Sequence, residues 1–149
     1  MYRNILIATD GSELSAKGVQ AGLDLAKASG AKVTIVIASE PFPAYDLGTR
    51  LGFFTDQQAV EAYGAGCQKI ADAALSSARK AAEEAGVACD TLHVANSVPG
   101  KAILETAAAR SCDLIVLTSH GRHGFERFLL GSTASRVVQS AEISVLVVR

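Results

Sequence analysis

The stretch DLIVLT (Asp113–Thr118), continued by SHGRHGFERFLLGSTAS (Ser119–Ser135), decides the fold. Its first part is a nearly continuous run of Ile, Leu and Val, which is typical of a strand covered on both faces and therefore of a parallel sheet. Its second part holds three glycines, two histidines and two arginines and ends in small hydroxylated residues. This order predicts a buried strand, then a loop whose backbone and charges suit an anion, then a helix.

Similar apolar runs recur along the chain, and segments with helical periodicity separate them. The other expected strands are Asn4–Thr9, Lys32–Ala38, Val87–Val94 and Ile143–Val148. The expected helices are Glu13–Ser29, Asp56–Ala85, Pro99–Arg110 and Ser132–Ser140. Strands that alternate with helices form βαβ units. We therefore predict an α/β fold. It consists of a single domain over residues 1–149, with an open, five-stranded, mostly parallel, Rossmann-like sheet and helices on both faces.

The composition argues against several functional classes. A length of 149 residues suits one domain, and a net charge of −1 supplies no basic field that would attract nucleic acid. The first apolar run, Ile5–Ala8, is too short for a signal peptide, and no run approaches a membrane span. The three cysteines form no CxxC pair and are interpreted as small buried residues in a reducing compartment. We expect a cytoplasmic protein with neither a membrane nor a nucleic acid as partner.

Ligands of open α/β sheets bind at the carboxyl ends of the strands, so the residues that follow each strand are the first candidates for a site. Thr9 and Asp10 follow the first expected strand, and Ser39 follows the second. An aspartate at such a place either contacts a ligand or only stabilises a turn. The sequence favours the ligand role for Asp10 because other polar residues end the neighbouring strands.

The stretch after Thr118 supplies two groups of residues suited to phosphate. Ser119-His120-Gly121 leave the strand, and Gly131-Ser132-Thr133 enter the last helix. Backbone N–H groups near glycine, together with the N-terminus of a helix, form an anion site. The alternative is a plain loop in which Ser132 only caps its helix.

The segment Ser39–Thr55 is too long for a routine connection, and it contains two prolines and two glycines. Such loops often act as lids or contact surfaces. The segment could equally be a surface loop that folds its aromatic side chains over the core. The residues leave both interpretations open.

From end to end the chain resembles the universal stress protein family. The family carries Gly-x-x-Gly, nine residues, then Gly-Ser/Thr, and its first strand ends in Asp-x-Ser. The matching residues here are Thr118–Gly121, the nine residues Arg122–Leu130, Gly131-Ser132, and Asp10-Gly11-Ser12. Thr118 replaces the first motif glycine, and its side chain could either crowd a ligand or donate a hydrogen bond to it.

This resemblance implies an adenine nucleotide alpha hydrolase-like fold that binds ATP, with or without Mg²⁺. Asp10 would accept a hydrogen bond from the adenine or ribose, and Ala8, Ile37 and Leu117 would form apolar walls for the base. Glycine N–H groups and hydroxyls would hold the phosphates, from Gly121, Gly131, Ser132 and Thr133. The remaining expected site residues are Thr9, Thr118, Ser119, His120 and Arg122. For His120 and Arg122 the alternative is a loop histidine and a solvated charge.

No feature of the sequence identifies an enzyme. It contains neither the P-loop GxxxxGK[ST] nor the GxSxG elbow, and no His and carboxylate cluster suggests a metal site. We expect a nucleotide-binding regulatory protein of the stress response, with no catalytic residue assigned. The alternatives are a slow ATPase, or a family member that has lost nucleotide and acts only through contacts with an unknown protein partner.

The last apolar run suggests how the protein associates with itself. Ile143–Val148 ends the chain, and a terminal strand tends to lie at a sheet edge, where it can pair with another strand. The resemblance implies the same homodimer, through the C-terminal strand. The alternative is a strand covered only by its own helices.

Overall fold

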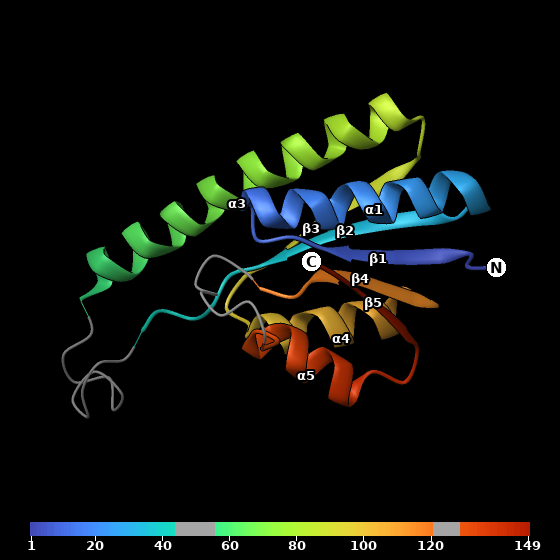
Figure 1. Cartoon of the computed structure of the whole chain (residues 1–149). Coiled ribbons are helices and arrows are strands. Elements are labelled where there is room, and N and C mark those ends of the chain that lie inside the picture. Colours follow the sequence, from blue (N-terminus) through green and yellow to red (C-terminus); the bar gives the residue numbers. More distant parts are fainter. Residues whose placement is uncertain (44–55, 121–128) are drawn as a thin grey trace.

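Five parallel strands form the centre of the structure, and helices cover both faces of the sheet (Figure 1). The computed structural model describes residues 1–43, 56–120 and 129–149. The strands are β1 (Asn4–Ala8), β2 (Lys32–Ala38), β3 (Cys89–Val94), β4 (Leu114–Thr118) and β5 (Ser144–Val148). The helices are α1 (Glu13–Ser29), α3 (Gln57–Ala85), α4 (Pro99–Ala109) and α5 (Ser132–Ser140). The predicted α/β fold is confirmed.

The strand order is β3-β2-β1-β4-β5, and every neighbouring pair runs parallel. β1 is central, so the chain first builds the sheet outward to β3 and then crosses back to add β4 and β5. β5 lies at one edge, as expected for a terminal strand. The order reverses between β1 and β4, which is the place where sheets of this kind bind ligands.

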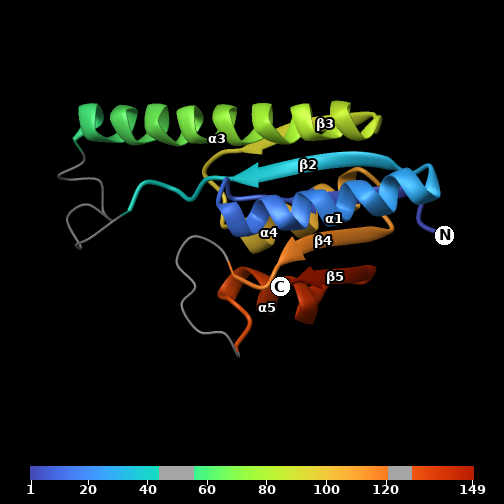
Figure 2. The same cartoon turned by 45° about the horizontal axis from the view of Figure 1, so that its top comes forward.

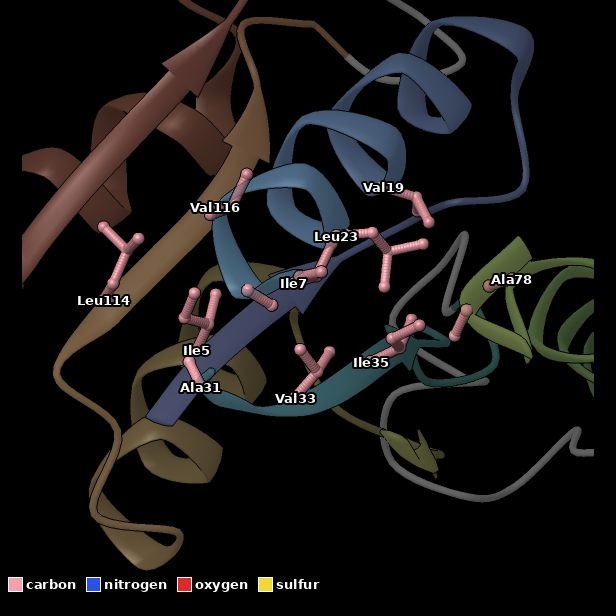
Figure 3. Close-up of a cluster of buried hydrophobic side chains, with 12 residues drawn as sticks. Ile5, Ile7, Val19, Leu23, Ala31, Val33, Ile35, Ala78, Leu114 and Val116 are labelled. Carbon is pink, nitrogen blue, oxygen red and sulfur yellow. The ribbon is translucent and has the colours of Figure 1, made fainter. Parts of the chain in front are cut away.

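Alternating side chains of the strands form one apolar layer on each face of the sheet. Ile5 and Ile7 of β1 pack with Leu23 of α1 on the α1/α3 face (Figure 3). Leu6 and Ile115 pack with α4 and α5 on the other face. Because helices cover both faces of the sheet, the sequences of β1 and β4 are nearly continuous apolar runs.

Helix boundaries follow the local chemistry of the sequence. Ser12 caps α1 by accepting a hydrogen bond from the N–H of Ser15, and Gly30 ends the helix at a φ of 67°. At the end of α3, Gly86 takes a φ of 71° and the N–H of Val87 donates to the carbonyl of Ala82. Val87 thus belongs to the end of α3. The strand expected from Val87 therefore begins at Cys89 instead.

The long helix α3 extends well beyond the carboxyl ends of the strands (Figures 1 and 2). Its buried residues are Ala71, Ala78 and Ala82, while Ile70 is 43% exposed. Next to its first turns, the hydroxyl of Tyr63 donates to the carbonyl of Glu40, and the Phe42 ring meets the Tyr63 ring edge to face at 5.6 Å. The aromatic ring of Phe42 therefore contacts α3. The rest of the Ser39–Thr55 segment, from residue 44, lies outside the described residues.

Candidate functional site

A cavity of about 450 Å³ opens at the carboxyl ends of the strands, where the strand order reverses. Eleven of the thirteen expected site residues line it: Ala8, Thr9, Asp10, Ile37, Leu117, Thr118, Ser119, His120, Gly131, Ser132 and Thr133. The other two, Gly121 and Arg122, lie outside the described residues. The structure thus gathers residues from four separate segments of the chain around one space.

The β1 side of the cavity is ordered by hydrogen bonds within its own loop. The Asp10 Oδ1 accepts from the N–H of Ser12 at 2.9 Å, and the Thr9 hydroxyl lies 2.9 Å from that of Ser15. Gly11 permits the turn with a φ of 80°. Asp10 therefore stabilises a turn and also faces the cavity, so both roles considered for it are compatible.

The β4 side begins with Thr118, whose side chain has two contacts within the protein. Its Oγ1 donates to the carbonyl of His120 at 3.0 Å, and its methyl group packs against Gly18 of α1. Ser119 is buried, and its Oγ lies 3.1 Å from Nδ1 of His120. These bonds hold the first turn of the loop after β4 beside the cavity.

The first turn of α5 closes the cavity opposite β1. The N–H of Gly131 donates to the carbonyl of Ser119 at 2.7 Å, which joins the two halves of the motif. A Cβ on Gly131 would lie 3.1 Å from that carbonyl oxygen, so glycine permits the close approach. Gly131 is the N-cap and provides no side-chain cap. The first helical bond comes from Ser135, so the N–H groups of residues 132–134 have no acceptor among the described residues.

The apolar walls come from both faces of the sheet. Ala8 and Leu117 pack on the α4/α5 face. Ile37 also lines the cavity, but strand alternation puts it on the opposite face, with Ile35. Ile103 of α4 completes the wall beside Ala8 and Leu117.

Sequence reasoning missed the outer wall of the cavity. Half of the lining comes from residues that were not assigned to the site: Ser15, Val36, Ala38, Ser39, Glu40, Tyr63, Cys67, Ile70, Pro99, Ile103 and Ala134. Of these, Ser39 was a first candidate, because it follows the second expected strand. Tyr63, Cys67 and Ile70 lie on the N-terminal half of α3. The recurrence of apolar residues at intervals of three and four near the start of α3 was the available signal, but it does not reveal what the helix covers.

A second cavity of about 500 Å³ lies at the opposite ends of the strands, around the start of β3. There Arg79 donates to the Thr91 hydroxyl, and Arg110 Nη1 lies 3.2 Å from Asp90 Oδ2. Burial raises the pKa of the Cys89 thiol in this cavity, with smaller contributions from neighbouring charges. Both arginines have partners within the wall, and the sequence did not single out this cavity.

The sequence model of the universal stress protein family matches residues 1–149. The chain belongs to the universal stress protein family. A universal stress protein from Methanocaldococcus jannaschii is 33% identical over 149 residues, covering 100% of this chain and 83% of that protein. One from Bacillus subtilis is 30% identical over 149 residues and 100% of both chains.

Among solved structures, a universal stress protein in complex with cAMP is 26% identical and has a TM-score of 0.70. The match covers 99% of this chain and 97% of that one. Ser119 and Gly131 both belong to the motif that the chain shares with universal stress proteins, and the backbone bond between them joins its two halves. Within the described residues, no helix is long and apolar enough to cross a bilayer.

Proposed function

We propose that this universal stress protein binds an adenine nucleotide, with ATP as its ligand, in the cavity between β1 and β4. The observation that carries the proposal is the first turn of α5. The close approach of Gly131 to Ser119 brings the N–H groups of residues 132–134, which have no acceptor among the described residues, next to the loop after β4. Ser132 and Thr133 add hydroxyls at the same place. A helix N-terminus of this kind attracts phosphate. The cAMP complex of a related universal stress protein supports the same ligand class.

The base would lie on the apolar side of the cavity. Ala8 and Leu117 offer a flat apolar wall, and Ile37 borders it from the neighbouring strand. Asp10, at the end of β1, would accept a hydrogen bond from the adenine or ribose. This arrangement puts the phosphates toward α5, where the positive end of the helix dipole lies.

Mg²⁺ would bind together with the nucleotide phosphates rather than at a site made of protein ligands alone. This ion commonly keeps water ligands and binds through phosphates and one or two protein oxygens. The hydroxyls of Ser132 and Thr133 are suitable oxygens at the α5 terminus. Bound there, Mg²⁺ would neutralise phosphate charge.

In this proposal, nucleotide occupancy regulates a cytoplasmic protein of the stress response. The protein is a homodimer, joined through β5, and occupancy alters its contacts with a protein partner. Slow hydrolysis of ATP is a second candidate, because His120 lines the end of the cavity where the phosphates would lie. A universal stress protein without nucleotide, acting only by contact, is the third.

Thermal unfolding of nucleotide-stripped protein tests the proposal. ATP with Mg²⁺ at a hundred times its dissociation constant should add about 2.7 kcal/mol of stability, a rise in Tm of about 5–10 °C. AMP and cAMP are compared in parallel. In Gly131→Val the rise should disappear, because a side chain would separate α5 from Ser119. The matched control is Gly64→Ala, where a Cβ meets no atom within 4 Å.

The outcomes separate the candidates. A Tm that no nucleotide changes would contradict the proposal and favour the protein that acts only by contact. Release of phosphate from bound ATP within the time of the experiment would favour the ATPase. A rise in Tm that survives in Gly131→Val would mean that the nucleotide binds elsewhere.

A further inference from the structure

Three polar side chains form a hydrogen-bonded chain from the cavity wall to α3. Ser39 follows β2 and lines the cavity. Its Oγ lies 2.7 Å from Nε2 of His93 on β3, and Nδ1 of His93 lies 3.1 Å from Oε1 of Gln68 on α3. β2, β3 and α3 are neighbours in the fold (Figure 2). The site therefore depends on three separate elements that the sheet brings together.

The direction of each hydrogen bond follows from the chemistry of the groups. The Gln68 Oε1 only accepts, so Nδ1 of His93 carries a proton. In a neutral imidazole the other nitrogen, Nε2, then has a lone pair and accepts from the Ser39 hydroxyl. Ser39 is the donor, His93 the base, and Gln68 the group that orients the base. This is the order of groups in an activated serine.

The sheet holds this serine firmly. The N–H of Ser39 donates to the carbonyl of Val94 at 3.0 Å, and the N–H of Ser97 donates to the carbonyl of Ser39 at 3.0 Å. His93 pairs with Ile37 in the register of β2 and β3. The nucleophile and the base thus stand on paired segments rather than on a free loop, which keeps their separation constant.

The start of α4 lies beside the serine and can stabilise negative charge. Ser97 immediately precedes the N-cap, Val98, which has no side-chain cap bond, and Pro99 lines the cavity. The N-terminus of α4, the positive end of its dipole, therefore borders the same cavity as Ser39. An oxyanion that develops on a bound carbonyl group would be favoured there.

We propose that Ser39 is a nucleophile that accepts an acyl group from a small ester bound in the cavity. The Ser39 Oγ forms a bond to the ester carbonyl carbon while its proton passes to Nε2 of His93. The bond from that carbon to the alkoxy oxygen breaks, and His93 returns the proton to the departing oxygen. The products are an acyl-serine and an alcohol. This activity is separate from nucleotide binding and requires no nucleotide.

Reaction with p-nitrophenyl acetate tests the proposal on the whole protein without nucleotide. The expected result is a burst of p-nitrophenol and one added acetyl group per chain, which peptide mapping assigns to Ser39. Ser39→Ala should remove both. Ser29→Ala is the matched control and should keep both, since the Ser29 hydroxyl donates to the carbonyl of Leu25 on α1 and Ser29 does not line the cavity. Acetylation only at other residues would overturn the proposal.

Two further variants separate activation from a structural role. His93→Gln keeps a hydrogen-bonding side chain but cannot take a proton, so the rate of Ser39 acetylation should fall about a hundredfold or more. Gln68→Glu places a carboxylate behind His93, which stabilises the imidazolium and should raise the rate. Thermal unfolding checks that each variant is folded. An unchanged rate in folded His93→Gln would overturn the role of His93 as a base.

Discussion

The γ-methyl group of Thr118 lies 2.9 Å from the point where a Cβ on Gly18 would stand. α1 therefore reaches the end of β4 because residue 18 has no side chain. The Thr118 hydroxyl is also engaged, since it donates to the carbonyl of His120. Thr118 stands where the family motif has glycine. Its methyl group packs toward α1, and its hydroxyl bonds to the loop after β4.

Gly18→Ala should therefore destabilise the protein. In an exposed helix the change would add about 1 kcal/mol of stability, but overpacking against Thr118 costs about 1–3 kcal/mol. Urea denaturation measures the difference. In a Thr118→Ser background the penalty should shrink, because the clashing methyl group is gone. Equal penalties in the two backgrounds would contradict the contact.

Thr118→Gly should change the affinity for AMP by less than about tenfold, or 1.4 kcal/mol. The reason is that the Thr118 side chain is held by its contacts with α1 and with the His120 carbonyl. Isothermal titration calorimetry of both proteins provides the comparison. A much tighter complex with the glycine variant would identify Thr118 as an obstacle to the nucleotide.

Bound nucleotide should slow the alkylation of Cys67 by a maleimide. Cys67 lines the proposed nucleotide cavity, whereas Cys89 lies in the second cavity at the other end of the sheet. Mass spectrometry of digested protein follows both thiols. The Cys89 rate should not change with AMP, which makes this residue the internal control. Cys112 should react slowest, because it is buried and burial raises the pKa of its thiol. Equal protection of Cys67 and Cys89 would argue against the proposed location.

Asp113 should make the fold sensitive to acid. Partial burial acts to raise the pKa of its carboxyl, but hydrogen bonds from the N–H groups of Arg3 and Asn4, at 2.8 and 3.0 Å, outweigh burial and lower it. A lowered pKa in the folded state means that the carboxylate stabilises the fold above its unfolded pKa of about 3.9 and loses this effect as pH falls further. Asp113→Asn should be less stable than the parent at pH 7. That difference should narrow below about pH 4 in denaturant titrations, and a constant difference would contradict the assignment.

Val147→Pro should dissociate the proposed homodimer. The carbonyl of Val148 accepts from the N–H of Ser119, so Val148 faces β4 and Val147 presents its backbone to the open edge. Proline at 147 removes an outward N–H without removing a bond to β4. Analytical ultracentrifugation should show a monomer, with circular dichroism to confirm folding. A folded variant that stays dimeric would move the interface away from the β5 edge.

The sequence predicts the elements whose ends are set by local chemistry. Ser12 and Gly30 define both ends of α1, because a cap and a left-handed residue are encoded at single positions. What α3 packs against could not be predicted in this way. The spacing of its apolar residues identifies one face of the helix, but it does not show whether that face covers the sheet. Ile70 continues that face yet is 43% exposed and lines the cavity instead of the core.

The candidate site likewise contains some residues that the sequence predicts and others that it does not. Asp10 and Ser119 could be predicted, because every residue that ends a parallel strand reaches the same edge of the sheet. Tyr63 and Cys67 could not, since their distance to the cavity depends on how far α3 extends. The chain from Ser39 to Gln68 also depends on the register of β2 and β3, which no local pattern encodes. Whether the predicted residues bind a nucleotide stays a prediction.

The central position of β1 has a consequence for synthesis on the ribosome. β2 begins at Lys32 and can pair with β1 early, whereas β4 begins only at Leu114. A nascent chain therefore carries one unpaired edge of β1 until most of the protein has emerged. Because Gly131 and Ser132 follow later still, a prematurely terminated chain would have the first wall of the cavity but not the second. Ligand binding would thus distinguish finished molecules from incomplete ones.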